Sequence, residues 1–183
     1  TEKGASRSAL LQKIAEKEAN SGQFAIPEIE LSPLEQDLLP GMREILSSHD
    51  DNATISFAHD LFADWARLHL ILSHEDTLAE FIKDKLVNPH WHKALRLYGV
   101  VLLDKDSTAK TWQFKMQEHP EIANFLLEAL IFAGNSQEHL SLAWPILTID
   151  NGRLLKDLLK RFLHVATIPN PRYIQSALEV GAS

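Results

Sequence analysis

The stretch Ser56-Phe57-Ala58-His59-Asp60-Leu61-Phe62-Ala63-Asp64-Trp65 decides how this chain is expected to fold. Before it, apolar Ile55 and Phe57 alternate with polar neighbours, which is typical of a half-buried strand. After His59 the apolar residues return every three or four positions, which is typical of an amphipathic helix. The strand therefore gives way to a helix at His59-Asp60. A histidine at a helix N-terminus lies beside backbone N–H groups, where a phosphate is readily bound.

The residues that precede this junction predict a β-hairpin. Residues 44–48 and 52–57 flank the polar cluster His49-Asp50-Asp51, whose residue types suit a tight turn. Residues 23–31 alternate only weakly and contain Pro27, so we expect an extended connector there.

Two helices are expected before the hairpin. One covers residues 8–20, and the other begins at Ser32-Pro33-Leu34-Glu35. In that second start, the serine caps the helix, the proline suits the first helical position and the glutamate completes a capping box. Helix, helix, hairpin and helix together predict a winged-helix-like module over residues 1–75.

From His59 to the end the pattern is helical, with one apolar stripe formed by Leu61, Trp65, Leu68 and Leu72. The later helices are expected from Asn88-Pro89 and near residues 107–118, 120–133, 137–149 (bent or split at Pro145), 152–166 and after Pro169-Asn170-Pro171. Their connectors are short and the pairs recur about every 30 residues, which favours stacked antiparallel helical hairpins. We therefore expect a mainly α protein whose residues 76–183 form an α-solenoid-like, helical-repeat region. The four tryptophans, Trp65, Trp91, Trp112 and Trp144, are expected to anchor its core.

Composition excludes several classes of function. The formal net charge is −7, whereas broad binding to nucleic acid needs a basic face. Without cysteine, thiolate catalysis, disulfides and cysteine–zinc sites are excluded. No apolar run approaches the roughly 20 residues of a membrane span, so no membrane partner is expected.

Because the first residue is threonine, we expect the chain to be a piece of a longer protein.

No catalytic or metal-binding motif is found. The seven glycines are scattered singly, so the chain has neither a P-loop nor a nucleophile elbow. His90 and His92 are two positions apart, which directs them to different faces of a helix. Asp104 and Asp106 are best explained by a loop and a helix cap. We therefore expect this chain not to be an enzyme, and to have no catalytic residue and no metal ligand.

His59-Asp60 allows two interpretations. A lone histidine at a strand–helix junction is usually a structural hydrogen-bonding group, and Asp60 in the first helical turn can cap N–H groups and complement the helix dipole. In the other interpretation, the imidazole binds a ligand.

Residues 57–66, Phe-Ala-His-Asp-Leu-Phe-Ala-Asp-Trp-Ala, resemble the Met-His-Asp motif of the winged-helix domain in STAND-type signalling NTPases. This class includes NB-ARC and NACHT-like proteins. In that family the motif follows the wing hairpin and opens a helix, and helical repeats follow. Ala58 stands where the family usually has methionine, at a position that is mainly used for packing.

The resemblance implies that His59 and Asp60 are cofactor-binding residues. The family's histidine contacts the β-phosphate of ADP in the resting state, and its aspartate supports the local backbone. ADP or ATP would then be held by an upstream NTPase domain in cis, which this chain lacks. An imidazole N–H can donate to a phosphate oxygen in a charge-assisted hydrogen bond, so its loss would favour the active form of a two-state switch.

Three functions follow from these observations. The first is a cytoplasmic regulatory fragment of a STAND-like signal-transduction ATPase that couples nucleotide state to a helical sensor arm. The second is an α-helical scaffold for protein–protein interaction, in which the helical region binds a protein or peptide and no nucleotide is involved. The third, a winged-helix transcription regulator, is disfavoured by the acidic charge.

Overall fold

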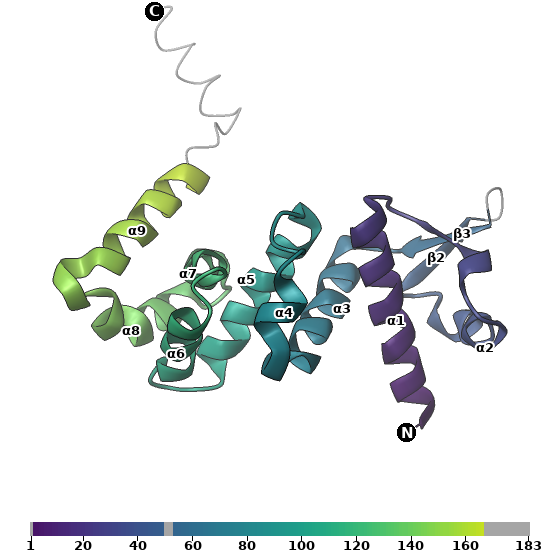
Figure 1. The fold of residues 1–183 in the computed structure, drawn as a ribbon, viewed down its shortest axis with the longest axis horizontal. Coiled ribbons are helices and arrows are strands. Elements are labelled where there is room, and N and C mark those ends of the chain that lie inside the picture. Colours follow the sequence, from purple (N-terminus) through teal and green to yellow (C-terminus); the bar gives the residue numbers. More distant parts are fainter. Residues whose placement is uncertain (1, 50–52, 167–183) are drawn as a thin grey trace, which may run out of the picture. The chain divides into compact units, whose positions relative to one another are not determined.

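The computed structural model describes residues 2–49 and 53–166, which form a mainly helical protein with one small antiparallel sheet (Figure 1). This confirms the predicted fold class. The chain divides into two compact units, Thr1–Tyr98 and Gly99–Ser183. The expected boundary between residues 75 and 76 lies inside the first unit. The sequence predicted that boundary as a division between functional modules, and this division stays a prediction.

The first unit follows the order helix, strand, short helices, hairpin and helix of a winged-helix-like module. Its elements are α1 (Glu2–Ser21), β1 (Ile26–Pro27), the 3-10 helix η1 (Glu28–Glu30), α2 (Pro33–Gln36), the 3-10 helix η2 (Leu39–Met42), β2 (Leu46–His49), β3 (Thr54–Phe57), α3 (Asp60–Ser73), the 3-10 helix η3 (Glu75–Thr77), α4 (Leu78–Ile82) and the first part of α5 (Pro89–Asp104).

The predicted hairpin is confirmed, since β2 pairs with β3 in antiparallel register, with Leu46 opposite Phe57 and Ser48 opposite Ile55. The turn predicted at Asp50-Asp51 lies outside the described residues. The expected connector, however, contains a strand, because Ile26 pairs with Ile55 and gives the sheet the order β1-β3-β2. Pro27 is tolerated because β1 lies at the edge of the sheet, where a missing N–H breaks no ladder.

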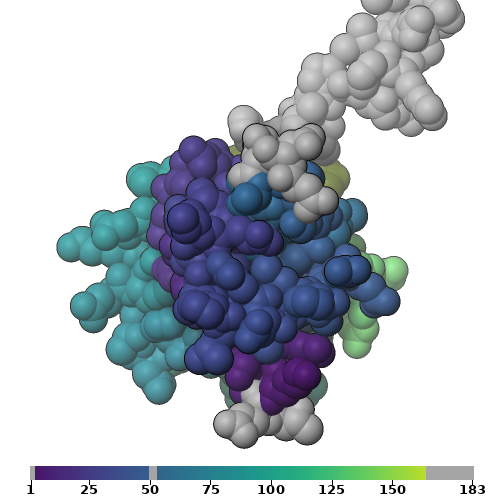
Figure 2. All heavy atoms as spheres, turned by 90° about the vertical axis from the view of Figure 1, so that its right-hand side faces the viewer, coloured from purple at the N-terminus to yellow at the C-terminus, as the bar shows by residue number. Residues whose placement is uncertain are grey.

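One face of the sheet closes over α1. Ile26, Leu46 and Ile55 pack with Leu10 and Ile14 of α1 in a buried cluster that also contains Leu31 and Met42. Burying side chains of this size stabilises the fold by about 1.5–3 kcal/mol each, so this cluster holds the hairpin in place. Figure 2 shows the face of this unit formed by the segment between α1 and α3, drawn in blue.

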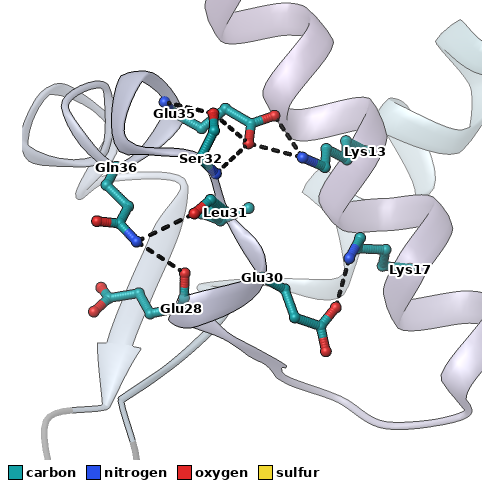
Figure 3. A network of polar contacts seen from close by, with 8 residues as sticks. All are labelled: Lys13, Lys17, Glu28, Glu30, Leu31, Ser32, Glu35 and Gln36. Atoms are coloured by element: carbon teal, nitrogen blue, oxygen red, sulfur yellow. Dashed lines mark hydrogen bonds and ion pairs between the residues drawn. The ribbon is translucent and has the colours of Figure 1, made fainter.

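A polar network fixes the start of α2 to α1 (Figure 3). The Ser32 hydroxyl accepts the Glu35 N–H, and the Glu35 carboxylate accepts the Ser32 N–H at 2.7 Å, so the predicted capping box is present. Lys13 of α1 donates to both carboxylate oxygens of Glu35 at 2.7 Å. These bonds from Lys13 and Ser32 lower the pKa of Glu35 to about 2. The ion pair between Lys17 and Glu30 adds a second link to the same segment.

The buried face of α3 contains Leu68 of the predicted stripe, and Leu72 is partly buried, but the first half of the prediction is wrong. Leu61 and Trp65 are nearly half exposed, whereas Asp64 and Arg67 are buried. The helix is rotated because small Ala63 and Ala66, together with Leu70 and Ile71, fit against the neighbouring helices. The two charged residues are accommodated there by ion pairs with each other and with other helices, described below, which periodicity alone does not reveal.

Up to residue 166, where the described part ends, the second unit consists of the end of α5 and four further helices that pack against one another in sequence. They are α6 (Lys110–Glu118), α7 (Ala123–Phe132), α8 (Ser136–Leu147) and α9 (Ile149–Ala166), and α7 contacts α6, α8 and α9. The buried Trp112 indole donates to the Leu126 carbonyl at 2.9 Å. The core role predicted for Trp91 and Trp112 is confirmed, but the prediction was wrong for Trp65 and Trp144, which are half exposed.

A left-handed turn, not Pro145, separates α8 from the regular part of α9. Pro145 lies inside α8, and the chain changes direction at Asp150, Asn151 and Gly152, all with positive φ. Asn, Asp and Gly adopt this conformation most readily, so the sequence suits the turn. The short helix predicted after Pro169-Asn170-Pro171 lies outside the described residues.

Candidate functional site

His59 lies where the sheet ends and α3 begins. Strand β3 ends at Phe57, the Ala58 N–H donates to the Ile45 carbonyl at 2.8 Å, and α3 starts at Asp60. His59 is the N-cap, with extended backbone (φ −152°, ψ 137°), and its Nδ1 accepts the Leu61 N–H at 3.0 Å. The ring itself is exposed.

This capping bond defines the chemistry of the imidazole. An Nδ1 that accepts a hydrogen bond carries no proton, so in the neutral ring the proton is on Nε2. His59 is therefore a structural cap through one nitrogen and a donor through the other. The two sequence interpretations of this residue are compatible, because each uses a different ring atom.

Asp60 lies in the first turn of α3, as expected, but it does not have the capping role that was predicted for it. It is the first residue of α3 and complements the helix dipole, but the ring of His59, not the Asp60 carboxylate, caps the helix. Asp60 is exposed and borders a hollow of about 220 Å³ that Glu18, Asp64 and Arg67 also line. The structure therefore places the predicted pair beside a group of charged side chains.

Four charged residues from three helices form a network at this hollow. The Arg67 guanidinium of α3 contacts Glu18 of α1 at 2.6 Å and Asp64 at 3.3 Å, and it donates to the Ala15 carbonyl at 3.3 Å. Lys93 of α5 contacts the other carboxylate oxygen of Asp64 at 2.7 Å. Asp64 thus joins the helix that begins at His59 to α5.

Glu18 is the unusual member of this network. Its side chain is almost fully buried, and burial raises its pKa to about 6, against the opposing attraction of Arg67. The nearby negative charges of Asp60 and Asp64 raise the pKa further. A carboxyl group with this pKa changes charge close to physiological pH, which is a property often found in functional sites.

Sequence reasoning missed Glu18, Asp64, Arg67 and Lys93 as a group. The one local signal was the spacing of Asp64 and Arg67, three residues apart on a helix, which is the spacing of a helical ion pair. Counted from Asp64, Glu18 is 46 positions away in the sequence and Lys93 is 29 positions away, so only the fold brings these partners together.

The opposite side of α3 is apolar and exposed. Leu61, Phe62 and Trp65 are each more than a third exposed, and Phe62 contacts the edge of the His59 ring at a centroid distance of 6.5 Å. Phe62 and Trp65 also line a hollow of about 340 Å³ between α1 and α3. Exposed aromatic residues grouped on one helix are typical of a surface that another protein or domain covers.

No metal centre is evident within residues 2–49 and 53–166, where no group of three or more histidine, aspartate or glutamate side chains is suitably placed. His92 contacts the Leu86 carbonyl through Nε2 at 2.9 Å, while His90 borders the hollow near Glu18. The two histidines therefore take part in different surroundings, as their spacing predicted.

Comparison with models of known protein families, with curated proteins and with solved structures finds no match. None of the helices in the described part of the chain has the length and hydrophobicity needed to cross a membrane.

Proposed function

We propose that this chain is a regulatory part of a STAND-type signalling ATPase, in which His59 contacts ADP held by an NTPase domain in cis. The observation that carries this proposal is an exposed imidazole whose capping bond leaves Nε2 as a donor, beside exposed Leu61, Phe62 and Trp65. The helical second unit acts as the sensor or relay arm. The nucleotide is cytosolic in this class, so a cytoplasmic location belongs to the proposal.

The donor role of His59 supports selective binding of a diphosphate. A hydrogen bond to a charged acceptor contributes about 1.5–3 kcal/mol, which corresponds to a change in ADP affinity of roughly ten- to a hundredfold. This range is enough to bias a switch whose two states differ by a few kcal/mol.

The apolar side of α3 supports a docking face next to the histidine. An NTPase domain that covered Phe62 and Trp65 would bring its nucleotide close to the first turn of α3, where His59 and Asp60 lie. The bond between Lys93 and Asp64 offers a route for coupling, because it connects this same helix to α5.

The test uses the full-length protein and two variants of His59. His59→Ala removes both the capping acceptor and the imidazole, whereas His59→Asn keeps a good N-cap and removes only the imidazole. We expect both variants to release bound ADP at least tenfold faster and to raise basal signalling. His59→Ala alone is expected to lose about 1 kcal/mol of stability as well, from the missing cap.

The outcomes separate the two roles. Unchanged ADP retention in both variants removes the nucleotide role and leaves a helix cap. Loss of ADP in His59→Ala but not in His59→Asn shows that only the fold of the helix start matters. A parent protein whose coding sequence has no Gly-Lys-Ser/Thr phosphate-binding loop upstream of Thr1 also contradicts the proposal.

A second candidate function is a scaffold for protein–protein interaction. An apolar groove on the second unit, lined in part by half-exposed Trp144 and Phe162, favours it. This candidate needs no nucleotide, so it predicts that a peptide ligand binds the chain equally well with or without the His59 imidazole.

A further inference from the structure

A groove of the first unit combines apolar walls with one charged side chain. It lies between α1 and α3, which pack against each other, and has a volume of about 340 Å³ (Figure 1). Its apolar lining includes Leu11 of α1, Ile45 before β2, and Phe62 and Trp65 of α3. Phe62 and Trp65 are 37% and 49% exposed, so the wall formed by α3 presents aromatic surface to solvent. An apolar side chain of another molecule would be well packed in this groove.

Arg7 is the one charged side chain among the described residues that line the groove. Within residues 2–49 and 53–166 no carboxylate pairs with its guanidinium, and its buried Nε has no hydrogen-bond partner. Arg67 of the same unit differs in this respect, because Glu18 and Asp64 hold its guanidinium. Buried donors in folded proteins are rarely left without an acceptor. The unpaired guanidinium of Arg7 therefore points to an acceptor that another molecule supplies.

The position of this guanidinium is set by Gly41 in η2. A Cβ at residue 41 would overlap the end of the Arg7 side chain, so the missing side chain makes room for it. Arg7 is accordingly only partly exposed. A guanidinium that the fold already holds loses less freedom when an anion binds to it, which favours binding.

The charges around the groove do not balance Arg7. Three charged residues that adjoin lining residues in the sequence are paired with other side chains, namely Lys13, Asp64 and Arg67. The two exposed ones, Lys3 and Glu44, have opposite signs and offset each other.

His69 is the other lining residue that can carry a charge. Its ring lies 6.2 Å from the Trp65 ring, measured between centroids. An imidazole can donate a hydrogen bond to an anion and never carries a negative charge. No acidic residue lines the groove in the described part of the chain, so its lining is apolar with a positive charge.

We propose that this groove binds a segment of another polypeptide or domain in which glutamate or aspartate stands next to an aromatic or aliphatic side chain. The carboxylate accepts charge-assisted hydrogen bonds from the Arg7 guanidinium, whose planar shape suits it. The apolar side chain packs against Phe62 and Trp65. A polypeptide is a better occupant than a small acid, because the exposed apolar surface continues beyond the groove to Leu61.

This inference rests on the proposed function only for the docking face of α3, and it names the chemistry that this face recognises. Binding of the segment requires neither a nucleotide nor the His59 imidazole. We therefore expect His59→Asn to leave peptide binding intact. A failure in the peptide assay below contradicts this inference alone, and unchanged ADP retention in the His59 variants contradicts the nucleotide role alone.

The test uses this chain and two peptides of about ten residues that differ at one position. One contains Phe-Glu at its centre and the other contains Phe-Gln, so their shapes agree and only the charge differs. The indole N–H signal of Trp65 in NMR spectra, assigned by its loss in Trp65→Phe, reports occupation of the groove. We expect at least about fivefold tighter binding of the glutamate peptide, with a preference that weakens as salt is added.

A matched pair of arginine variants tests the assignment to Arg7. Arg7→Met removes the charge but keeps an unbranched side chain, and it is expected to abolish the preference for glutamate over glutamine. Arg43→Met removes the same charge at an exposed position of the same unit, beside a different hollow, and is expected to retain the preference. Arg7→Met is also expected to leave the thermal midpoint unchanged or higher, because the guanidinium has no acceptor to lose.

Four results would overturn the inference. Equal affinity for both peptides shows that the groove does not recognise a carboxylate. A preference that survives Arg7→Met but not Arg43→Met places the contact at the other hollow. A large fall in the thermal midpoint of Arg7→Met shows that the arginine is a structural residue. Tighter binding of 4-phenylbutyrate than of the glutamate peptide makes a small acid the ligand.

Discussion

Replacing Glu18 with glutamine should make the protein more stable at neutral pH, even though the substitution removes a buried ion pair. Burial raises the pKa of Glu18 from its ordinary 4.5 to about 6, although Arg67 lies 2.6 Å away. The fold therefore disfavours the charged carboxylate relative to the neutral acid. A rise of this size corresponds to about 2 kcal/mol of differential interaction. Glutamine resembles the neutral acid in shape and can still accept a hydrogen bond from Arg67.

Proton binding determines whether Glu18 makes the protein more or less stable as pH rises. Between pH 4.5 and about 6 the folded protein holds more protons at Glu18 than the unfolded chain does, so stability falls as pH rises through this window. The stabilising contribution of the protonated group is complete below pH 4.5 and is lost above about 6. The advantage of Glu18→Gln should therefore reach about 2 kcal/mol near pH 7.5 and shrink towards zero as pH approaches 4.5.

Urea denaturation at several pH values, followed by tryptophan fluorescence, measures this difference. Glu44→Gln, at an exposed position of the same unit, is the control and should change stability by less than about 0.5 kcal/mol. If Glu18→Gln instead destabilises the protein by about 1 kcal/mol or more near pH 7.5, the attraction of Arg67 outweighs the cost of burial and the reasoning is wrong. Asp60 and Asp64, which also raise this pKa, and the neighbouring Lys93 and His90 remain unchanged in the comparison.

Arg67→Met should cost about 3–5 kcal/mol in the same denaturation assay, because it leaves two buried carboxylates without their guanidinium partner; a loss below about 1 kcal/mol would contradict the role given to the network. Gly99→Ala should cost about 1–3 kcal/mol, since an added Cβ would lie 2.7 Å from the Cβ of Ala129. Gly134→Ala, which meets nothing within 4 Å, is its control, and equal losses would refute the close packing. Asp106→Ala should lower the thermal midpoint, because the hydrogen bonds from Thr108 and Thr111 that hold the Asp106 pKa far below its ordinary value are lost. The difference in thermal midpoint between the wild-type protein and Asp106→Ala should become smaller as pH falls below 3.8. A difference that does not depend on pH would count against a role for the carboxylate charge.

Local signals in the sequence were sufficient where a few neighbouring residues determine the conformation. The Ser32–Glu35 capping box and the β2–β3 hairpin belong to this group, because their hydrogen bonds join residues close in the chain. The helix start at Asp60 was also predictable. The residue that caps this helix was not predictable, because the ring of His59 accepts the hydrogen bond that Asp60 was expected to accept.

Packing between residues distant in the sequence decided which face of α3 is buried, which periodicity alone does not determine. The apolar residues of α3 allowed more than one buried face, and the fold chose the one that carries Asp64 and Arg67. That choice exposed Leu61 and Trp65, which simple amphipathicity placed in the core. Burying charges is costly unless partners satisfy them, and the partners Glu18 and Lys93 come from helices distant in the sequence.

The sequence by itself determined a mainly helical chain with one hairpin and a histidine at the start of the helix that follows, because these features depend on side-chain periodicity and on capping within a few residues. Only the tertiary structure decided that the imidazole is exposed with Nδ1 engaged, that Glu18 is buried beside Arg67, and that α7, α8 and α9 line an apolar groove. Each of these depends on which surfaces of separate helices meet, and that is a property of packing over the whole unit.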